Sequence, residues 1–176
     1  MIEFIEVKAT KRSISLRKLV YGVGVNDADY MVNVSTDIKT LHCPFYERWK
    51  QMLRRCYSEK YQAKQPTYIG CSVCDDWLAF SNFKVWMIDQ DWVGKHLDKD
   101  ILVQGNKVYS PLTCVFVSQS VNNILSENKL TRGGTRQGVC FHKPMGKFLA
   151  KINIHGKKTH IGYFNSEEDA FQSYKT

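Results

Sequence analysis

The sequence predicts an α+β protein in which a central mixed region precedes a small three-stranded antiparallel sheet and a helix. Apolar residues fall at helical spacing in the central region, and strict alternation replaces that spacing after residue 136. A polar stretch with two adjacent glycines separates the two patterns. We therefore expect a lead-in over residues 1–41, a central domain over 42–126, a linker over 127–135 and a C-terminal domain over 136–176.

The central region contains two predicted helices. Pro44–Tyr61 is the stronger, because proline suits a first helical turn and five apolar residues share one face. Asp75–Met87 has a dense aromatic face and is the second helix. The apolar face of the first helix carries Tyr46, Trp49, Met52, Leu53 and Cys56. The remaining predicted elements are a strand over Leu97–Leu102, extended segments over Val108–Tyr109 and Cys114–Val117, and a short helix over Ser118–Leu125.

The C-terminal region reads as three strands and a helix. The strands span Gln137–Lys143, Lys147–Ile154 and Lys158–Phe164, and Ser166 with three acids after it caps the helix. The helix is expected to cover one face of the sheet, which leaves the other face open with its basic side chains. Alternation in the middle strand places Phe148, Ala150, Ile152 and Ile154 on one face and Lys147, Leu149, Lys151 and Asn153 on the other.

The positive charge of the chain is concentrated near its C-terminal end. The formal net charge is +8, and residues 129–176 hold nine Lys and Arg against three acids, a net +6. This distribution favours a polyanionic partner, nucleic acid before an anionic membrane. No apolar stretch approaches the roughly 20 residues that span a bilayer, so we expect no membrane association.

Six cysteines raise the question of disulfides or metal. The chain opens with charged residues and shows no signal-peptide pattern, so we expect a cytoplasmic protein with reduced thiols. The spacing Cys71-x-x-Cys74 is that of half a zinc site, and no second such pair exists. His42, Cys43 and Cys114 can complete it only through tertiary contact. Free core cysteines are therefore favoured over structural zinc at Cys71 and Cys74.

A single pattern of spaced glycines, aromatic residues and lysines extends through the last forty residues. The string G-V-x-F, K-F-x-A-x-I, G-K-K, H-I-G-x-F, S-E-E-D-A-F and a final Y begins at Gly138 and ends at Tyr174. It resembles the ethylene-response-factor (Apetala-type) DNA-binding domain. The resemblance implies double-stranded DNA as partner, with contacts from the three strands. Carried onto this sequence, it assigns DNA contacts to Arg132, Arg136, Phe141, Lys143, Lys147, Phe148, Lys151, Lys157, Lys158, His160 and Tyr163.

The stretch LDKDILVQGNKVYSPLTCVFVSQSVNN looks like the ββα-metal core of HNH nucleases of phages and mobile elements. In that fold a divalent ion stabilises the leaving oxygen and a base activates water. The resemblance places Asp98 at the first ligand position, Lys99 at the general-base position and Asn106 in the loop. It places Asn122 or Asn123 at the end of the returning helix.

The base position is the point at which this sequence departs from that family. A lysine at its ordinary pKa of about 10.4 is a poor base, so Asp100 or His96 are alternatives. An oxygen-rich set such as Asp98, Asp100 and Asn122 suits magnesium or manganese.

Together the two resemblances favour a metal-dependent HNH-like DNA endonuclease or nickase of phage or mobile-element type, anchored on DNA by its C-terminal domain. Such a protein acts in the cytoplasm of a host or phage-infected bacterium. The alternative is a catalytically inactive DNA-binding regulator, or an accessory or defence-related factor.

Overall fold

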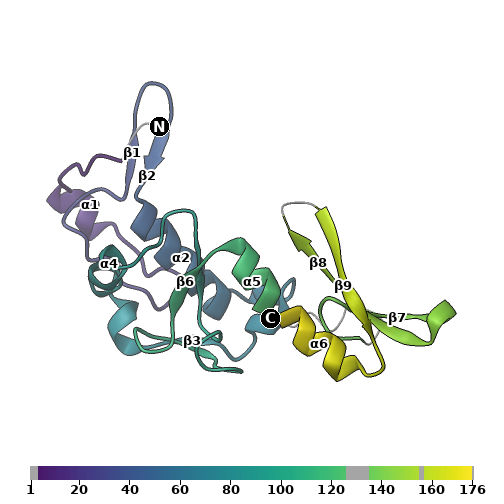
Figure 1. Cartoon of the computed structure of the whole chain (residues 1–176). Coiled ribbons are helices and arrows are strands. Elements are labelled where there is room, and N and C mark those ends of the chain that lie inside the picture. Colours follow the sequence, from purple (N-terminus) through teal and green to yellow (C-terminus); the bar gives the residue numbers. More distant parts are fainter. Residues whose placement is uncertain (1–3, 126–134, 155–156, 176) are drawn as a thin grey trace. The chain divides into compact units, whose positions relative to one another are not determined.

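The computed structural model describes residues 4–125, 135–154 and 157–175. The protein is a mixed α+β chain in two compact units, Met1–Gln119 and Ser120–Thr176 (Figure 1). Each unit has its own hydrophobic core. The expected linker over residues 127–135 lies outside the described residues apart from Thr135.

The N-terminal segment is an integral part of the first unit. It contains helix α1 (Lys11–Ser15) and a hairpin of strands β1 (Asn33–Ser35) and β2 (Thr40–His42). Ala28, Tyr30 and Val32 are buried in the same core as the central helices. Residues 4–41, expected as a lead-in, therefore share one folded unit with the region that follows them.

Helix α2 (Pro44–Tyr57) supplies the buried face that its sequence predicts, and all five expected core residues are buried. The predicted helix over 44–61 is interrupted, because Ser58 is extended and its side chain caps α3 (Glu59–Gln62) by accepting from the Tyr61 amide. A short 3₁₀ turn, η1 (Pro66–Tyr68), follows.

The second predicted helix is also two elements, η2 (Asp75–Leu78) and α4 (Phe80–Ile88). The break falls at Ala79, which pairs with Val25 of the N-terminal segment, and the Phe80 amide donates to the Val25 carbonyl at 3.0 Å. Asp27 then accepts from the Ser81 amide in the first turn of α4 at 2.8 Å. A long-range pairing thus sets where this helix starts.

Two aromatic residues join α2 to η2 in the centre of the first core. The Trp49 Nε1 donates to the Trp77 carbonyl at 2.7 Å, and both side chains are almost fully buried. A buried indole needs such a partner, so this bond fixes the helix against the turn.

Four short strands and a helix complete the central region. Strands β4 (His96–Asp98) and β6 (Val115–Val117) pair antiparallel, whereas β3 (Ser72–Val73) and β5 (Val108–Tyr109) pair parallel. The predicted strand over 97–102 ends early, because the Asp98 carboxylate accepts from the Asp100 and Ile101 amides and turns the chain. Helix α5 (Gln119–Leu125) follows β6, and most of it belongs to the second unit.

The second unit contains the expected sheet and helix. Strands β7 (Val139–His142), β8 (Lys147–Ile154) and β9 (Lys157–Phe164) form an antiparallel sheet in that order, with a 3₁₀ turn, η4 (Lys143–Met145), between the first two. Ser166 caps α6 (Glu167–Lys175) by accepting from the Asp169 amide at 3.1 Å. The core of the unit consists of Val139, Ala150, Ala170, Phe171 and Tyr174.

The start of the sheet depends on a glycine. Gly138 has a φ of +73°, and a Cβ added there would lie 2.1 Å from the Tyr174 ring. Gly146, in the turn after η4, also has a positive φ of +61°, but open space surrounds its missing Cβ. Both glycines therefore adopt a left-handed backbone, but only Gly138 packs directly against a neighbouring ring.

We expect Gly138→Ala to destabilise the second unit by more than Gly146→Ala. A left-handed backbone costs an L-residue about 1–2 kcal/mol, and only Gly138→Ala adds a clash with the ring. Hydrogen exchange of the β8 amides reports this unit, while fluorescence of the four tryptophans, all between residues 49 and 92, serves as an internal reference. Equal exchange rates in the two variants would contradict this account.

Candidate functional site

Helix α6 covers one face of the C-terminal sheet and leaves the other open. Directly paired residues of antiparallel strands project to the same face. Leu149 pairs with Tyr163, Lys151 with His160, and His142 with Lys147. None of these belongs to the core under α6. We define the open face as Cys140, His142, Lys147, Leu149, Lys151, Asn153, Lys158, His160 and Tyr163.

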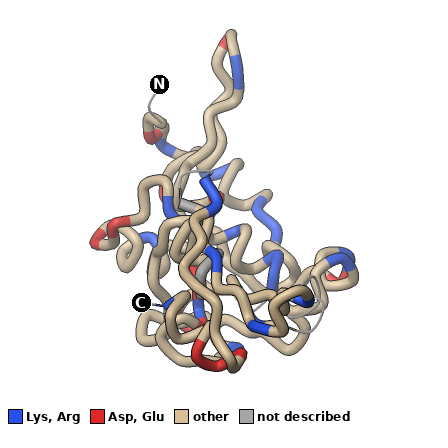
Figure 2. The backbone as a smooth tube through the Cα atoms, turned by 45° about the vertical axis from the view of Figure 1, so that its right-hand side comes forward, with Lys and Arg blue, Asp and Glu red and all other residues tan. Residues whose placement is uncertain are grey.

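The acidic residues described in the second unit lie in α6, away from the strands. Strands β7, β8 and β9 contain four lysines and no acidic residue. The acids Glu167, Glu168 and Asp169 lie together in the first turn of α6, where they complement the helix dipole. Figure 2 marks the Lys and Arg positions of the whole backbone in blue and the Asp and Glu positions in red. The open face therefore presents positive charge without acidic neighbours on its own strands.

Three aromatic rings form a contiguous row on the open face, which we call the His–Tyr–His row. The Tyr163 ring centroid lies 5.3 Å from that of His142 and 4.8 Å from that of His160. The His142 Nδ1 is buried and has no hydrogen-bond partner among the described residues. His142 is not among the contacts predicted from the sequence. Its pairing with Lys147 would have revealed it, but that register follows from the fold and not from the residue types.

A cavity of about 240 Å³ lies at the edge of the sheet beside Gly138. Lys151, Asn153 and Lys158 line it, and so does the Tyr174 ring. Two ammonium groups and an amide around one small cavity suit an anionic oxygen group such as a phosphate.

Several residues assigned to DNA contact lie elsewhere. Phe148 packs against the core under α6, and its pairing partner Phe141 contacts it with ring centroids 5.2 Å apart. Neither ring lies among the lysines, because both belong to the face that carries Val139 and Ala150. Lys157 also points away from the open face, since it pairs with Ile154.

Arg136 is held by the helix. Its guanidinium pairs with Glu168, its amide donates to Glu167 at 2.6 Å, and its charge lies 5.0 Å from the Phe171 ring centre. Lys143 is exposed in η4, and Arg132 lies outside the described residues. The open face retains Lys147, Lys151, Lys158, His160 and Tyr163 of the predicted contacts.

The second candidate site surrounds the end of β4. Asp98 is half-buried, and burial together with a hydrogen bond to the Asp100 side chain raises its pKa above the usual range. Its Oδ1 accepts from the Asp100 and Ile101 amides at 2.9 and 3.0 Å. Two carboxylates are thus brought close together, an arrangement that a cation would stabilise.

Lys99 is the buried charge of this turn, with only 6% of its surface exposed. Its Nζ lies 3.4 Å from Asp100 Oδ2. A lysine in an ion pair is an ammonium, which donates protons and does not accept them. The geometry therefore suits Lys99 to positive charge near the carboxylates better than to the predicted role of general base.

Asn106 has a structural part in the same loop. Its Nδ2 donates to the carbonyls of Lys99 and Val108, both at 2.7 Å, and its Oδ1 accepts from the Val108 amide. These bonds fix the loop that carries the carboxylates.

The remaining predicted catalytic and metal residues are only partly assembled. His96 precedes Asp98 by two residues on β4 and so projects to the same side of that strand. Asn122 and Asn123 belong to α5, beyond the boundary of the first unit. Across residues 4–125, 135–154 and 157–175, no group of three or more His, Cys, Asp or Glu is arranged to hold a metal ion.

All six cysteines are free thiols, and Cys43, Cys56, Cys71 and Cys114 are buried in the first core. Cys71 is buried and Cys74 is half-buried, and no third ligand of the kind zinc needs joins them in the described part of the chain. Burial raises the pKa of Cys56 and of Cys114 to about 12. Both thiols are therefore protonated at neutral pH, which makes them poor nucleophiles.

Comparison with known proteins gave no match. No family model, no curated protein and no solved structure is significantly similar to the chain. In the described ranges, every helix is too short or too polar to cross a bilayer.

We expect Asp98→Asn to stabilise the first unit at neutral pH. Asparagine keeps the oxygen that accepts both amides and removes a charge that burial disfavours. The folded state binds the Asp98 proton more tightly than the unfolded state does. The wild type therefore loses stability as pH rises from the ordinary aspartate pKa of about 3.9 through the raised folded value.

The stability gained by Asp98→Asn should disappear at pH values below the unfolded pKa of Asp98, where Asp98 is protonated in both the folded and the unfolded state. Urea unfolding followed by tryptophan fluorescence measures it, with Asp37→Asn in the exposed β1–β2 turn as the control. A variant less stable than the wild type at neutral pH would contradict the argument.

Proposed function

We propose that the protein binds double-stranded DNA through the open face of its C-terminal sheet. The single observation that carries the proposal is the grouping of Lys147, Lys151 and Lys158 on a face that α6 does not cover and on strands without an acid. Lysine ammonium groups contact phosphates and position a protein on a duplex.

The shape of the open face favours a duplex. A short antiparallel sheet fits the major groove, and several classes of DNA-binding protein insert β-strands there to contact the bases. The edge cavity beside Gly138 offers Lys151 and Lys158 to one backbone phosphate. Attachment through lysines makes phosphate contacts the main source of affinity.

The His–Tyr–His row gives this face its polar and aromatic centre. His160 is the exposed histidine of the row, and its imidazole can hydrogen-bond to a base edge or a phosphate. Tyr163, between the two histidines, holds both rings in place. The row is the part of the face that can distinguish one DNA sequence from another.

Lys158→Ala should weaken binding to a blunt duplex and lower the salt dependence of log K by about 0.9, the value for one phosphate contact. Lys157→Ala is the matched control, because it removes the same charge from the adjacent residue on the other face. Fluorescence anisotropy over a salt series gives both quantities. Equal effects of the two substitutions would overturn the assignment of the open face.

A second candidate function, metal-dependent DNA cleavage of the HNH-like type, is supported by the carboxylate pair at Asp98 and Asp100. Asp98 and Asp100 would hold a magnesium or manganese ion, which supplies Lewis-acid stabilisation of a leaving oxygen. The buried Lys99 adds positive charge beside them.

The competing role is that of a catalytically inactive DNA-binding regulator or accessory factor, and plasmid cleavage separates the two. With magnesium or manganese, the wild type should nick supercoiled DNA, and Asp98→Ala should lose at least about 100-fold of that rate while retaining duplex affinity. Wild-type protein that leaves the plasmid intact with magnesium, manganese and nickel would exclude cleavage and leave the binding role.

A further inference from the structure

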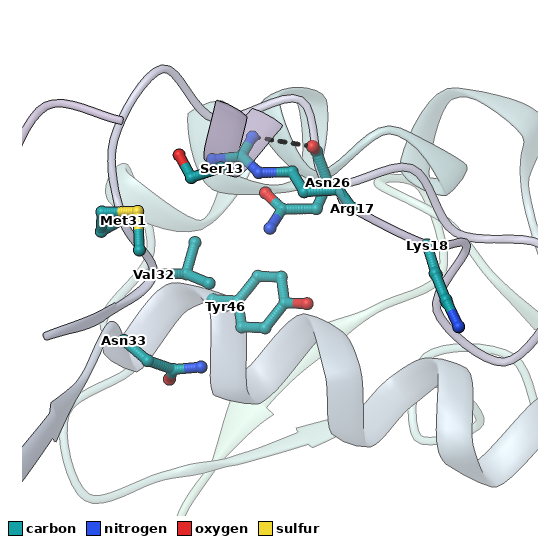
Figure 3. A pocket seen from close by; sticks show the side chains of 8 residues that line it. All are labelled: Ser13, Arg17, Lys18, Asn26, Met31, Val32, Asn33 and Tyr46. Carbon is teal, nitrogen blue, oxygen red and sulfur yellow. Dashed lines mark hydrogen bonds between the residues drawn. The ribbon is translucent and has the colours of Figure 1, made fainter. Parts of the chain in front are cut away.

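The first unit contains a polar cavity that the proposed DNA interface does not use. It has a volume of about 250 Å³ and lies between the N-terminal segment and α2 (Figure 3). Arg17, Lys18, Asn26, Asn33 and Tyr46 contribute its polar lining. None of its lining residues is acidic.

Tyr46 is the group in this cavity that points to a ligand. Only 8% of its surface is exposed, and among the described residues its hydroxyl has no hydrogen-bond partner. Figure 3 shows the hydroxyl projecting from α2 into the cavity. The ring is fixed from behind by Trp49 and Phe80, with centroids 5.5 and 5.2 Å away. The hydroxyl is not among the buried polar atoms that lack a partner, so it faces the cavity, where a rigid hydroxyl is placed to hydrogen-bond a ligand.

The cavity wall carries fixed positive charge. The Arg17 guanidinium donates to the carbonyls of Asn26 and Tyr30, both at 2.9 Å, and to that of Ala28. Burial raises the pKa of Tyr46, and the charge of Arg17 acts in the opposite direction. Lys18 adds a second cation at the rim. An anionic group is the natural complement of this wall.

The remaining lining suits a flat ring with a polar edge. Met31 and Val32 provide an apolar surface, while the amides of Asn26 and Asn33 can both donate and accept. The Asn33 Oδ1 accepts from the His42 Nδ1 at 2.7 Å, which orients the Asn33 amide. The volume lies just below the range of about 300–1,000 Å³ for drug-sized ligands. A cavity of this volume can hold a ligand no larger than one nucleotide.

We propose that the cavity binds a nucleoside monophosphate unit, with the base against Met31 and Val32 and the phosphate toward Arg17 and Lys18. The unit comes either from a free nucleotide or from an unpaired nucleotide at a DNA end. The Tyr46 hydroxyl hydrogen-bonds to it in both cases. This site is separate from the open face of the sheet, so the inference does not depend on the proposed duplex binding.

Saturation-transfer NMR on the full chain tests the site. The probes are the four deoxynucleoside 5′-monophosphates, inorganic phosphate, and a duplex with one unpaired 3′ nucleotide compared with its blunt form. We expect at least one nucleotide to bind. Tyr46→Phe should weaken it roughly fivefold, the effect of one hydrogen bond, and Lys18→Ala should weaken it by a similar factor. Tyr61→Phe, the same atomic change outside the cavity and outside the open face, should have no effect.

The arms of the experiment separate the possible sources of the ligand. Binding of the deoxynucleoside monophosphates supports a free nucleotide as the ligand. A preference for the overhang over the blunt duplex, abolished by Tyr46→Phe and not by Lys158→Ala, supports the DNA end. The proposal is overturned if no nucleotide probe binds, if inorganic phosphate binds as tightly as the nucleotides, or if Tyr46→Phe changes nothing.

Discussion

The packing of α6 on the middle strand of the C-terminal sheet determines what the rest of that unit can do. Ala150 and Ala170 are fully buried at this contact, and their small side chains let the helix approach the sheet. Because side chains alternate along a strand, covering Ala150 sends Lys151 and Leu149 to the opposite face. The basic open face is therefore a consequence of how the core forms.

The first unit shows how polar groups are arranged around an aromatic core. The indole of Trp49 and the guanidinium of Arg17 are both satisfied by backbone carbonyls, which ties distant segments together. Two groups differ from these: the Asp98 carboxylate is bonded to backbone amides but is half-buried as a charge, and the Tyr46 hydroxyl faces a cavity. Natural proteins retain a half-buried charge or a cavity-facing polar group where that group has a role beyond stability. Each candidate site of this unit contains one such group.

Local patterns predicted the elements whose own residues decide their structure. The buried face of α2 and the strands and capped helix of the second unit follow from spacing and alternation. Breaks that depend on distant residues were not predictable, as at Ala79, which is extended because it pairs with Val25. The same limit applies to the candidate sites. Lysine positions were predicted from alternation, whereas His142 and the engagement of Arg136 by Glu168 depend on strand register and helix placement.

The most direct test of the central claim maps duplex DNA onto the C-terminal unit by NMR titration of the full chain with a blunt duplex. The account predicts that the largest chemical-shift changes occur at the rings of His142, His160 and Tyr163 and at the amides of β8 and β9, with little change on the outer side of α6. Changes concentrated on α6, or confined to residues 4–119, would contradict the claim that the open face binds DNA.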